Sequence, residues 1–304
     1  MRYDSRSAMT GPIGVVIPLF NKSAFVRRAV ESVLHQTFTD LRVVVVDDGS
    51  SDEGVHVVEQ IEDPRLRVLR AGHRGPGAAR NLGMRSLDTD WIALLDADDE
   101  WHPTFLEKAR SAVHDAPAVV AVFTAIHVRD TPPARRAPVA GLIDDYHGAR
   151  LHHRVAMSSS SVLLNRKRFL AAGGFREGYR YAEDTEAWFR LACEGSVYYI
   201  PEALCEIELN AVGATTTSAH AGERAQGLQK LLDSYDHYRR ALRIPARQAA
   251  SCRRFMQHQR GRLAVHLCAS GRIAAGMEVL LTGVPVSRWT WREYAYCIRC
   301  CVRA

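Results

Sequence analysis

The chain has 304 residues, 47% hydrophobic and 24% charged, a composition typical of a globular protein with one large α/β domain and an appended element. No apolar stretch approaches about 18 residues and the first residues lack a signal-peptide core, which argues against a transmembrane helix and predicts a cytoplasmic location. The net charge of +6 is uneven, because from Arg243 onward eleven arginines face only two glutamates, giving that tail a charge of +9. Such a tail indicates an anionic partner surface, and nucleic acid is disfavoured because no recognised binding motif accompanies the charge.

Short apolar runs alternate with helix-period segments over the first 130 residues, which is typical of βαβ units. The first strand spans residues 14–19, and a helix follows from about Ala24 to His35 with Ser23 as its N-cap. The pattern then predicts a strand over 42–46, a helix starting near 51–53, a strand over 66–69, a short helix ending at Ser86, a strand over 91–95, a helix over 103–114 and a strand over 119–128.

The order is harder to interpret after residue 129. Residues 130–148 hold three prolines and little periodicity, which predicts a flexible loop. Helices are predicted over 166–172 and 183–194, and the chain is helical from about Gly222 to its end. The sequence therefore predicts an α/β domain over residues 1–220 and a basic helical extension over 221–304.

Two of the predicted strands end in carboxylates. Asp47 and Asp48 follow a run of valines, and Asp96 and Asp98 follow the strand at 91–95. Ligands of parallel sheets gather beyond the carboxyl ends of the strands, and alternation along an extended backbone would send Asp96 and Asp98 to the same side. Hard oxygen ligands suit Mg²⁺ or Mn²⁺ bound to phosphate oxygens, although acids at a strand end can also be merely solvated.

Three common nucleotide and hydrolase motifs are missing. The loop after the first strand lacks Gly-x-Gly-x-x-Gly, which argues against a dinucleotide-binding domain. Neither a P-loop nor the Gly-x-Ser-x-Gly of hydrolases occurs. The acidic strand ends therefore need another explanation.

Five blocks, in order and spacing, resemble those of family 2 glycosyltransferases: Val16–Asn21, Glu31–Thr37, Val46–Asp52, Gly75–Gly83 and Leu95–Asp99. The resemblance covers roughly residues 13–210. It implies a GT-A fold, a single Rossmann-like α/β domain that binds a nucleotide sugar through about residues 13–129 and the acceptor through about 130–220. It also implies metal-dependent transfer of a hexose or related sugar, with inversion at the anomeric carbon.

The resemblance also implies roles for residues on the donor side. Asp48 would accept a hydrogen bond from the nucleobase, and Phe20 would lie against the base or its ribose, where stacking is worth roughly 1–3 kcal/mol. Either Arg74 or Arg80 would serve the base or the diphosphate, whereas Asn81 could instead hold its loop. The other expected contacts to nucleotide sugar or metal come from Pro18, Asn21, Asp96 and Asp98, with Asp98 as a ligand of Mg²⁺ or Mn²⁺.

On the acceptor side, the resemblance implies that Asp184 is the catalytic base and Glu183 a weaker candidate. The chemistry needs one ionised carboxylate within hydrogen-bond reach of the acceptor hydroxyl, and a helix start favours the charged form. Both acids would also serve simply as helix N-terminal residues. His220 is a candidate metal ligand, although a lone histidine in a polar loop usually has no such role. Residues 158–161 could line the acceptor cleft or form a buried polar entry to a strand.

Together these observations predict an inverting glycosyltransferase that uses a nucleoside-diphosphate sugar, with UDP-sugar favoured. The acceptor would be a glycan or lipid-linked glycan in bacterial surface polysaccharide assembly. Aromatic and arginine residues over 288–303 suit a helix at a membrane interface, although a terminal helix packed on the catalytic domain is slightly favoured. Two alternatives remain: a sugar nucleotidyltransferase, whose Gly-rich clamping loop is missing, and an inactive nucleotide-sugar-binding scaffold.

Overall fold

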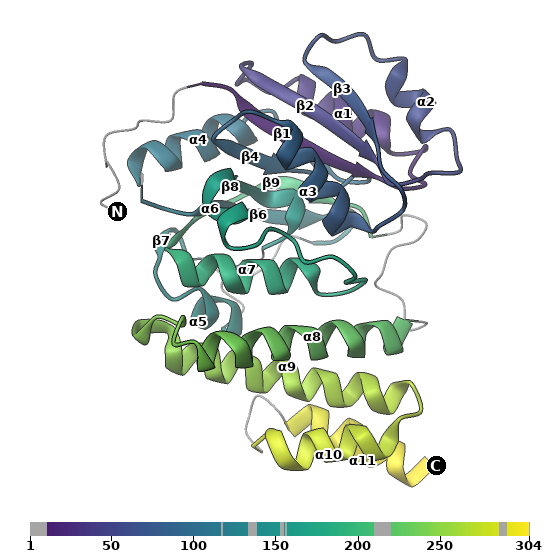
Figure 1. The fold of residues 1–304 in the computed structure, drawn as a ribbon, viewed down its shortest axis with the longest axis vertical. Coiled ribbons are helices and arrows are strands. Elements are labelled where there is room, and N and C mark those ends of the chain that lie inside the picture. Colours follow the sequence, from purple (N-terminus) through teal and green to yellow (C-terminus); the bar gives the residue numbers. More distant parts are fainter. Residues whose placement is uncertain are drawn as a thin grey trace.

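The structure, a computed structural model, is a mixed β-sheet flanked by helices, with further helices stacked beyond it (Figure 1). It describes residues 11–116, 118–132, 139–152, 155, 157–209, 220–285 and 291–303. The sheet has the strand order β3-β2-β1-β4-β8-β6-β9-β5, and β7 pairs with β9. Its strands are β1 Ile13–Leu19, β2 Leu41–Asp47, β3 Leu66–Arg70, β4 Trp91–Leu94, β5 Glu100–Trp101, β6 Ala121–Val128, β7 Gly141–Ile143, β8 Val162–Asn165 and β9 Val197–Ile207.

The first half of the sheet is parallel and agrees with the prediction from the sequence. β1 pairs in parallel with both β2 and β4, and β2 pairs in parallel with β3. The carboxyl ends of these strands therefore share one edge of the sheet, where the acidic residues lie.

The second half is mixed, and most of it was not predicted. β8 is antiparallel to both β4 and β6, and β5 and β7 are antiparallel to β9. The prediction of a flexible loop over residues 130–148 was wrong for part of that segment, because β7 and a helix, α5 Tyr146–Leu151, form within it. Residues 133–138 lie outside the described residues. These elements are stabilised by pairing with distant segments, which local periodicity does not record.

The helices of the α/β part cover both faces of the sheet, and the positions of all except α5 follow the predictions with small shifts. They are α1 Val26–Leu34, α2 Gly54–Glu59, α3 Pro76–Ser86, α4 Phe105–Asp115, α5, α6 Arg166–Ala171 and α7 Glu183–Glu194. The prediction of Ser23 as an N-cap was wrong. Phe25 occupies that position, and the Ser23 N–H instead donates to Asp52 Oδ2 at 2.8 Å.

Both faces of the parallel strands are buried, as their continuous apolar runs predict. Val15 and Ile17 of β1 belong to a core cluster with α1 and α4, whereas Val16 belongs to a second cluster with α3, α6 and α7. α3 approaches β1 closely at Gly83, where a Cβ would lie 2.4 Å from Val16 Cγ1. The glycine therefore sets how deeply α3 packs onto the sheet.

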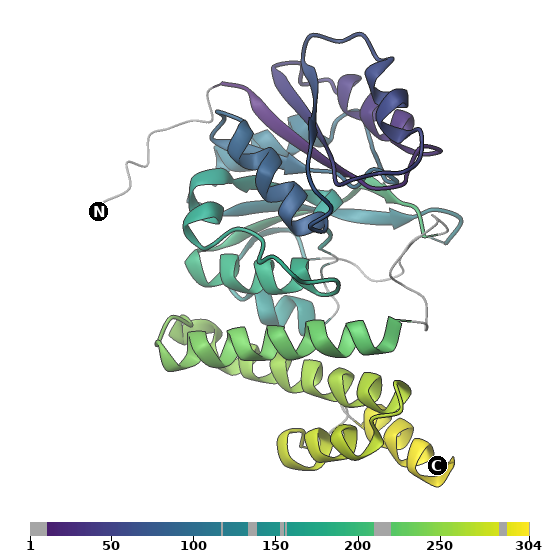
Figure 2. The same cartoon turned by 45° about the vertical axis from the view of Figure 1, so that its right-hand side comes forward.

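The C-terminal part is helical, as predicted, and comprises α8 Ala221–Arg240, α9 Ala249–Ala269, α10 Ile273–Gly283 and α11 Trp291–Arg303. α8 and α9 run side by side beyond α7, and α10 and α11 lie further out (Figures 1 and 2). Phe189 of α7 shares a core cluster with α8 and α9, so the extension packs directly on the α/β part. Among the described residues, no helix has both the length and the apolar character needed to cross a membrane. A domain boundary at residue 220 stays a prediction.

Candidate functional site

The loops after β1 and β2 are tied to each other by short polar side chains. Asn21 adopts a left-handed backbone conformation with φ 51°. Its Oδ1 accepts the Ser51 N–H at 2.8 Å, and its own N–H donates to Ser50 Oγ at 3.2 Å. Asp47 Oδ1 accepts the Ser50 N–H at 2.9 Å, which closes the turn after β2. Asn21, predicted to contact the donor, thus holds two neighbouring loops together at the sheet edge.

Asp48 holds the loop that enters α3. Its Oδ1 accepts the Arg74 N–H at 2.7 Å and its Oδ2 accepts the Gly75 N–H at 2.8 Å, and the side chain is almost fully buried. Gly75 has φ 92°, a conformation that glycine adopts without strain. A nucleobase would therefore meet an acceptor that is already oriented by two backbone donors. The predicted base contact itself stays a prediction.

The side chains around this loop differ in how accessible they are. Phe20 is 43% exposed, and its ring lies 4.6 Å from the His73 ring. The exposed ring face leaves room for a stacking partner. Arg74 is also exposed and pairs with Glu177, whereas Pro18 is half-buried within β1. Of these residues, Phe20 and Arg74 remain reachable by a ligand.

The Asp-x-Asp residues lie in a turn, which corrects the expectation of an extended strand end. β4 ends at Leu94, and the Asp99 N–H donates to the Asp96 carbonyl at 3.1 Å. Asp98 Oδ2 lies 2.8 Å from Lys22 Nζ, whereas Asp96 Oδ1 accepts from Arg80 at 2.5 Å. The two carboxylates are neighbours, but each faces its own cation.

Ser160 fixes this turn from the adjacent strand entry. The Asp96 N–H donates to Ser160 Oγ at 3.0 Å, and the Ser160 hydroxyl donates to Asp99 Oδ2 at 2.5 Å. Trp101 Nε1 donates to the Ser160 carbonyl at 2.6 Å. The serines at 158–161 thus form the buried polar strand entry that was one of their two predicted roles.

Negative charge is crowded in the turn. Burial raises the pKa of Asp98, and the nearby Asp96 carboxylate raises it further, against the opposing effect of Lys22. Burial, again reinforced by Asp96, raises the pKa of Asp99 to about 8. Acidic side chains crowded in this way create a site where an added cation is stabilised.

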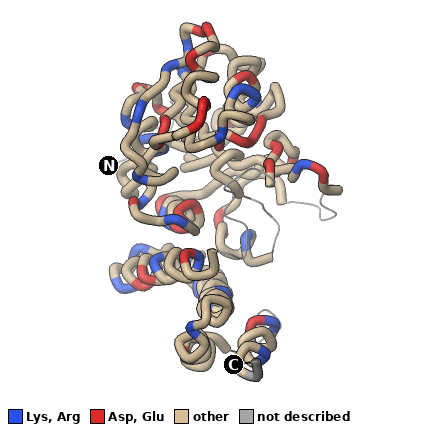
Figure 3. Tube along the Cα trace, turned by 90° about the vertical axis from the view of Figure 1, so that its right-hand side faces the viewer, with Lys and Arg blue, Asp and Glu red and all other residues tan. Residues whose placement is uncertain are grey.

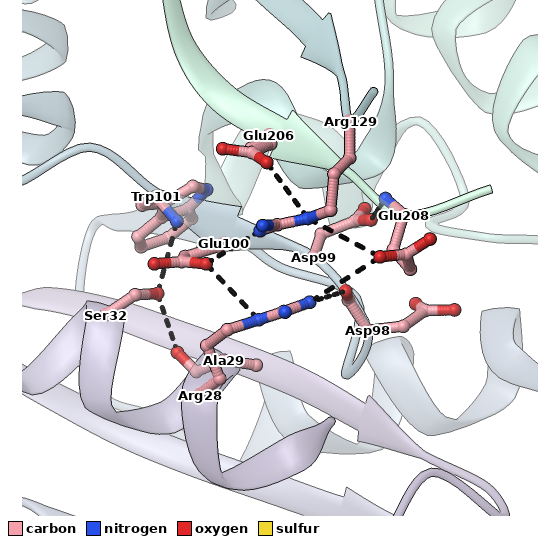
Figure 4. Close-up of polar contacts among 10 residues, drawn as sticks. All are labelled: Arg28, Ala29, Ser32, Asp98, Asp99, Glu100, Trp101, Arg129, Glu206 and Glu208. Atoms are coloured by element: carbon pink, nitrogen blue, oxygen red, sulfur yellow. Dashed lines mark hydrogen bonds and ion pairs between the residues drawn. The ribbon is translucent and has the colours of Figure 1, made fainter. Parts of the chain in front are cut away.

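A second network, which the sequence did not reveal, holds the turn from the other side (Figure 4). Arg28 of α1 donates to the Asp98 carbonyl at 3.3 Å and lies 3.2 Å from Glu100. The Glu208 N–H donates to Asp99 Oδ1 at 3.0 Å. Arg129 contacts Glu100 at 3.0 Å and also pairs with residues 206 and 208 at the end of β9. The network joins α1, β5, β6 and β9, and only the sheet topology brings them together.

Arg80 connects this turn to α7. Its guanidinium, 4% exposed, lies 2.5 Å from Asp96 Oδ1 and 3.3 Å from Glu183 Oε1, above the Phe175 ring. Burial acts to lower the pKa of Arg80, but Asp96, Glu183 and Asp184 outweigh it and raise that pKa. Arg80, predicted to bind base or diphosphate, is therefore a buried cation shared by the donor-side turn and the start of α7.

Asn81 secures the same junction on the neighbouring backbone. Its Nδ2 donates to the Phe175 carbonyl at 2.6 Å, and its Oδ1 accepts the Phe175 N–H at 2.9 Å. This arrangement agrees with the predicted alternative in which Asn81 holds a loop. The pair joins α3 to the segment that leads into α7.

The two acids at the start of α7 have different surroundings. Burial, reinforced by Asp184, raises the pKa of Glu183, while Arg80 opposes that rise. Asp184 Oδ1 accepts the Thr185 N–H at 2.5 Å and lies in the first turn of the helix. Because Glu183 already forms an ion pair with Arg80, Asp184 is the better candidate base.

His220 does not join two other described residues in a metal site. It occupies the N-cap position of α8, and its Nδ1 lies 3.2 Å from Glu223 Oε2. Within the part of the chain that the structure describes, no three histidine, cysteine or acidic side chains converge as a metal site. Two neighbouring carboxylates, Asp96 and Asp98, stay the predicted donor set, and Mg²⁺ is commonly held by one or two carboxylates plus phosphates and water.

The sequence profile of glycosyl transferase family 2 matches residues 14–174, more than half of the chain. The chain belongs to glycosyltransferase family 2. Chondroitin synthase of Escherichia coli is 27% identical over 195 residues, covering 62% of this chain and 27% of the synthase. The succinoglycan biosynthesis protein ExoO of Rhizobium meliloti is 40% identical over 108 residues, covering 35% of this chain and 31% of ExoO. The matched segments span less than a third of either relative.

Solved structures confirm the predicted GT-A fold of this family 2 member. TarS of S. aureus in complex with UDP-GlcNAc superimposes with a TM-score of 0.61 at 13% identity, covering 88% of this chain and 89% of TarS. The mannosyltransferase PcManGT from Pyrobaculum calidifontis, in complex with GDP-Man and Mn²⁺, gives 0.60 at 20% identity, covering 99% and 88%. At these sequence identities the structural similarity establishes the fold alone.

Proposed function

We propose that this family 2 member is an inverting glycosyltransferase that moves a hexose or related sugar from a nucleoside-diphosphate sugar to an acceptor hydroxyl. The observation that carries the proposal is the Arg80 bridge. It links Asp96, in the acidic turn after β4, to Glu183 beside Asp184 at the start of α7. Donor-side and acceptor-side acids that lie far apart in the sequence thus surround one buried cation.

In this mechanism Asp184 takes the proton from the acceptor hydroxyl as the oxygen attacks the anomeric carbon. General base catalysis requires a carboxylate within reach of the acceptor hydroxyl, and Asp184 lies in the first turn of α7. Arg80 pairs with Glu183 and so keeps it from competing for the acceptor proton. Direct displacement from the side opposite the diphosphate inverts the anomeric centre.

The donor would lie along the edge formed by the ends of β1, β2 and β4. Phe20 offers an exposed ring to the base or ribose, and Asp48 lies at the adjacent loop with its carboxylate already oriented. Arg74, exposed on the loop between β3 and α3, would approach the diphosphate. Relatives of the same fold hold UDP-GlcNAc and GDP-Man, and we propose a UDP-sugar for this chain.

Asp98, with Asp96, fits a divalent cation, since the two carboxylates are neighbours in one turn, where burial and then the charge of Asp96 raise the pKa of Asp98 and of Asp99. Mg²⁺ or Mn²⁺ bound there would supply charge neutralisation of the departing diphosphate. Asp98→Asn should lower Mn²⁺ affinity at least about tenfold by titration calorimetry, because losing even an outer-shell partner of a metal ligand costs about that much. Unchanged Mn²⁺ binding in that variant would remove Asp98 from the metal site.

The decisive experiment is a screen of UDP-, GDP-, CMP- and dTDP-sugars by thermal shift, followed by assay of the released nucleotide (a nucleoside diphosphate, or CMP from a CMP-sugar) with Mn²⁺ present. Asp184→Asn should abolish release while donor-induced stabilisation persists, and Glu183→Gln serves as the matched neighbour. Full turnover in Asp184→Asn would reject that residue as the base. Donor binding without release in the wild-type protein would favour an inactive scaffold instead.

We further propose that α11 contacts anionic lipid during transfer to a lipid-linked glycan in surface polysaccharide assembly. Trp291 and Ile298 are each 52% exposed and lie seven residues apart, hence on one face of the helix. The arginines of the last helices lie on α9 and α11, whereas α10 carries none (Figure 3). Residues 286–290, part of the predicted interfacial segment, lie outside the described residues.

Co-sedimentation with phosphatidylglycerol and phosphatidylcholine vesicles tests this second proposal. Binding to the anionic vesicles should fall when Trp291 and Ile298 are both replaced by serine. Leu242→Ser, at a site 90% exposed at the end of α8, is the matched control and should bind as wild type. Equal binding by all three proteins would show that α11 does not mediate membrane contact.

A further inference from the structure

The segment from Gly178 to Tyr181, which leads into α7, is held by side chains of the C-terminal helices. Lys230 of α8 donates to the Gly178 carbonyl at 2.6 Å and lies 4.9 Å from the centre of the Tyr179 ring. Arg262 of α9 donates to the Tyr181 hydroxyl at 2.7 Å. Charged groups from two helices of the extension thus meet the residues immediately before Glu183 and Asp184.

Backbone packing at this junction is tighter still. A Cβ on Gly227 of α8 would lie 2.0 Å from the Tyr181 carbonyl oxygen and 2.8 Å from its carbonyl carbon. Both atoms belong to the backbone and cannot rotate away as a side chain would. Any larger residue at position 227 must therefore displace either α8 or the Tyr181 peptide.

The peptide that Gly227 meets leads into a strained residue. Ala182, the N-cap of α7, has φ 62°, a left-handed conformation that costs an alanine roughly 1–2 kcal/mol. Such a conformation persists only when its surroundings fix it. Ala182 also accepts the Glu186 N–H at 3.0 Å, so its geometry sets the direction of the first turn that carries Asp184.

The extension also contacts α5. Asp145, the N-cap of α5, accepts from the Ser251 hydroxyl of α9 at 2.5 Å, and the buried His147 ring lies 3.0 Å from Gln248 Oε1. Between them, Tyr146 is buried, and its hydroxyl has no hydrogen-bond partner among the described residues. Burial raises the pKa of Tyr146 to about 12, with Arg150 opposing the rise and Asp184 adding to it.

We propose that α8 and α9 are a positioning element of the active site, in which Gly227 and Arg262 fix Tyr181 and Ala182 and thereby place Asp184 for proton abstraction. This inference rests on the proposed function, since it concerns the same base. The extension is then required for the chemical step itself, in addition to any contact that it makes with a membrane. Gly227, Arg262 and Tyr181 are positioning residues, because they act on the reaction only through Asp184.

Gly227→Ala tests the proposal against Gly222→Ala, a matched change on the same helix where a Cβ would meet nothing within 4 Å. With a donor that the wild-type protein turns over, Gly227→Ala should lower kcat about a hundredfold, the effect of misplacing a catalytic group by about 1 Å. The KM for the donor should change less than about twofold, since nucleoside diphosphate binds at the other end of the site. Hydrogen exchange over residues 178–186 should rise in Gly227→Ala and stay unchanged in Gly222→Ala.

Two less disruptive single variants test the same inference in case Gly227→Ala fails to fold. Tyr181→Phe and Arg262→Leu remove the same hydrogen bond, so each should lower kcat and the double variant should lower it no further than either alone. Wild-type kcat in both Gly227→Ala and Tyr181→Phe would overturn this inference and leave the proposed function intact. A wild-type protein that releases no nucleoside diphosphate from any donor would instead overturn the proposed function.

Discussion

Replacing Arg80 by methionine would remove the cation that joins the two acidic parts of the site. The guanidinium is 4% exposed and contacts Asp96 at 2.5 Å and Glu183 at 3.3 Å. Breaking a buried ion pair on one side costs about 3–5 kcal/mol, and we expect about 3 kcal/mol at pH 7. The lower end applies because the Asp96 side chain keeps 32% of its surface in solvent, where water can replace part of the lost interaction.

The cost should depend on pH in a definite direction. Arg80 opposes the rise in the pKa of Glu183, so its removal lets that pKa rise further. A carboxyl whose pKa is higher in the folded state binds protons on folding, and it therefore gains stability as the pH falls. The difference between wild type and Arg80→Met should accordingly be smaller at pH 5 than at pH 7.

Urea unfolding followed by circular dichroism at both pH values measures this difference without any substrate. Arg74→Met provides the control, because Arg74 lies on the loop that leads into α3, is 64% exposed and pairs with Glu177. Exposed pairs contribute about 0–1 kcal/mol, so that variant should remain close to wild type. Equal losses in the two variants, or an Arg80→Met loss that is the same at pH 5 and pH 7, would refute the assignment of Arg80 as the shared buried cation.

Two further predictions concern packing and acid stability. Gly83→Ala would place a Cβ 2.4 Å from Val16 Cγ1 and should cost about 1–3 kcal/mol in urea unfolding, whereas Gly72→Ala, with nothing within 4 Å, should be near neutral. Burial lowers the pKa of His147 from 6.5 to about 4, so its contribution to stability is complete above pH 6.5 and is lost as the pH falls toward 4. His147→Asn should flatten the stability profile in that window by up to about 1.4 kcal/mol per pH unit.

A specific outcome would contradict each of these two predictions. A Gly83→Ala protein as stable as Gly72→Ala would mean that α3 can shift away from β1 without cost. A wild-type profile that is already flat between pH 6.5 and pH 4, or an unchanged profile in His147→Asn, would mean that the histidine does not limit acid stability.

Local pattern alone identified the parallel half of the fold. Residues 13–19 and 41–47 are apolar runs, and burial on both faces of a parallel strand requires that composition. The same runs predicted that acids at their ends would share one edge of the sheet, because parallel strands end together. The family resemblance rested on five short blocks of sequence. Two of them overlap these strands, and each block can be recognised without knowing which distant residues it contacts.

Tertiary structure alone decided which groups these acids meet. Arg80 and Glu183 are 103 residues apart, and Glu208 reaches the Asp99 carboxylate across 109 residues. Hydrophobic periodicity records whether a position is buried, but it does not record which distant side chain lies opposite, because strand order and helix packing set that. For the same reason Gly227 appears in the sequence as an ordinary helix glycine, and only the packing of α8 on Tyr181 shows why no larger residue fits there.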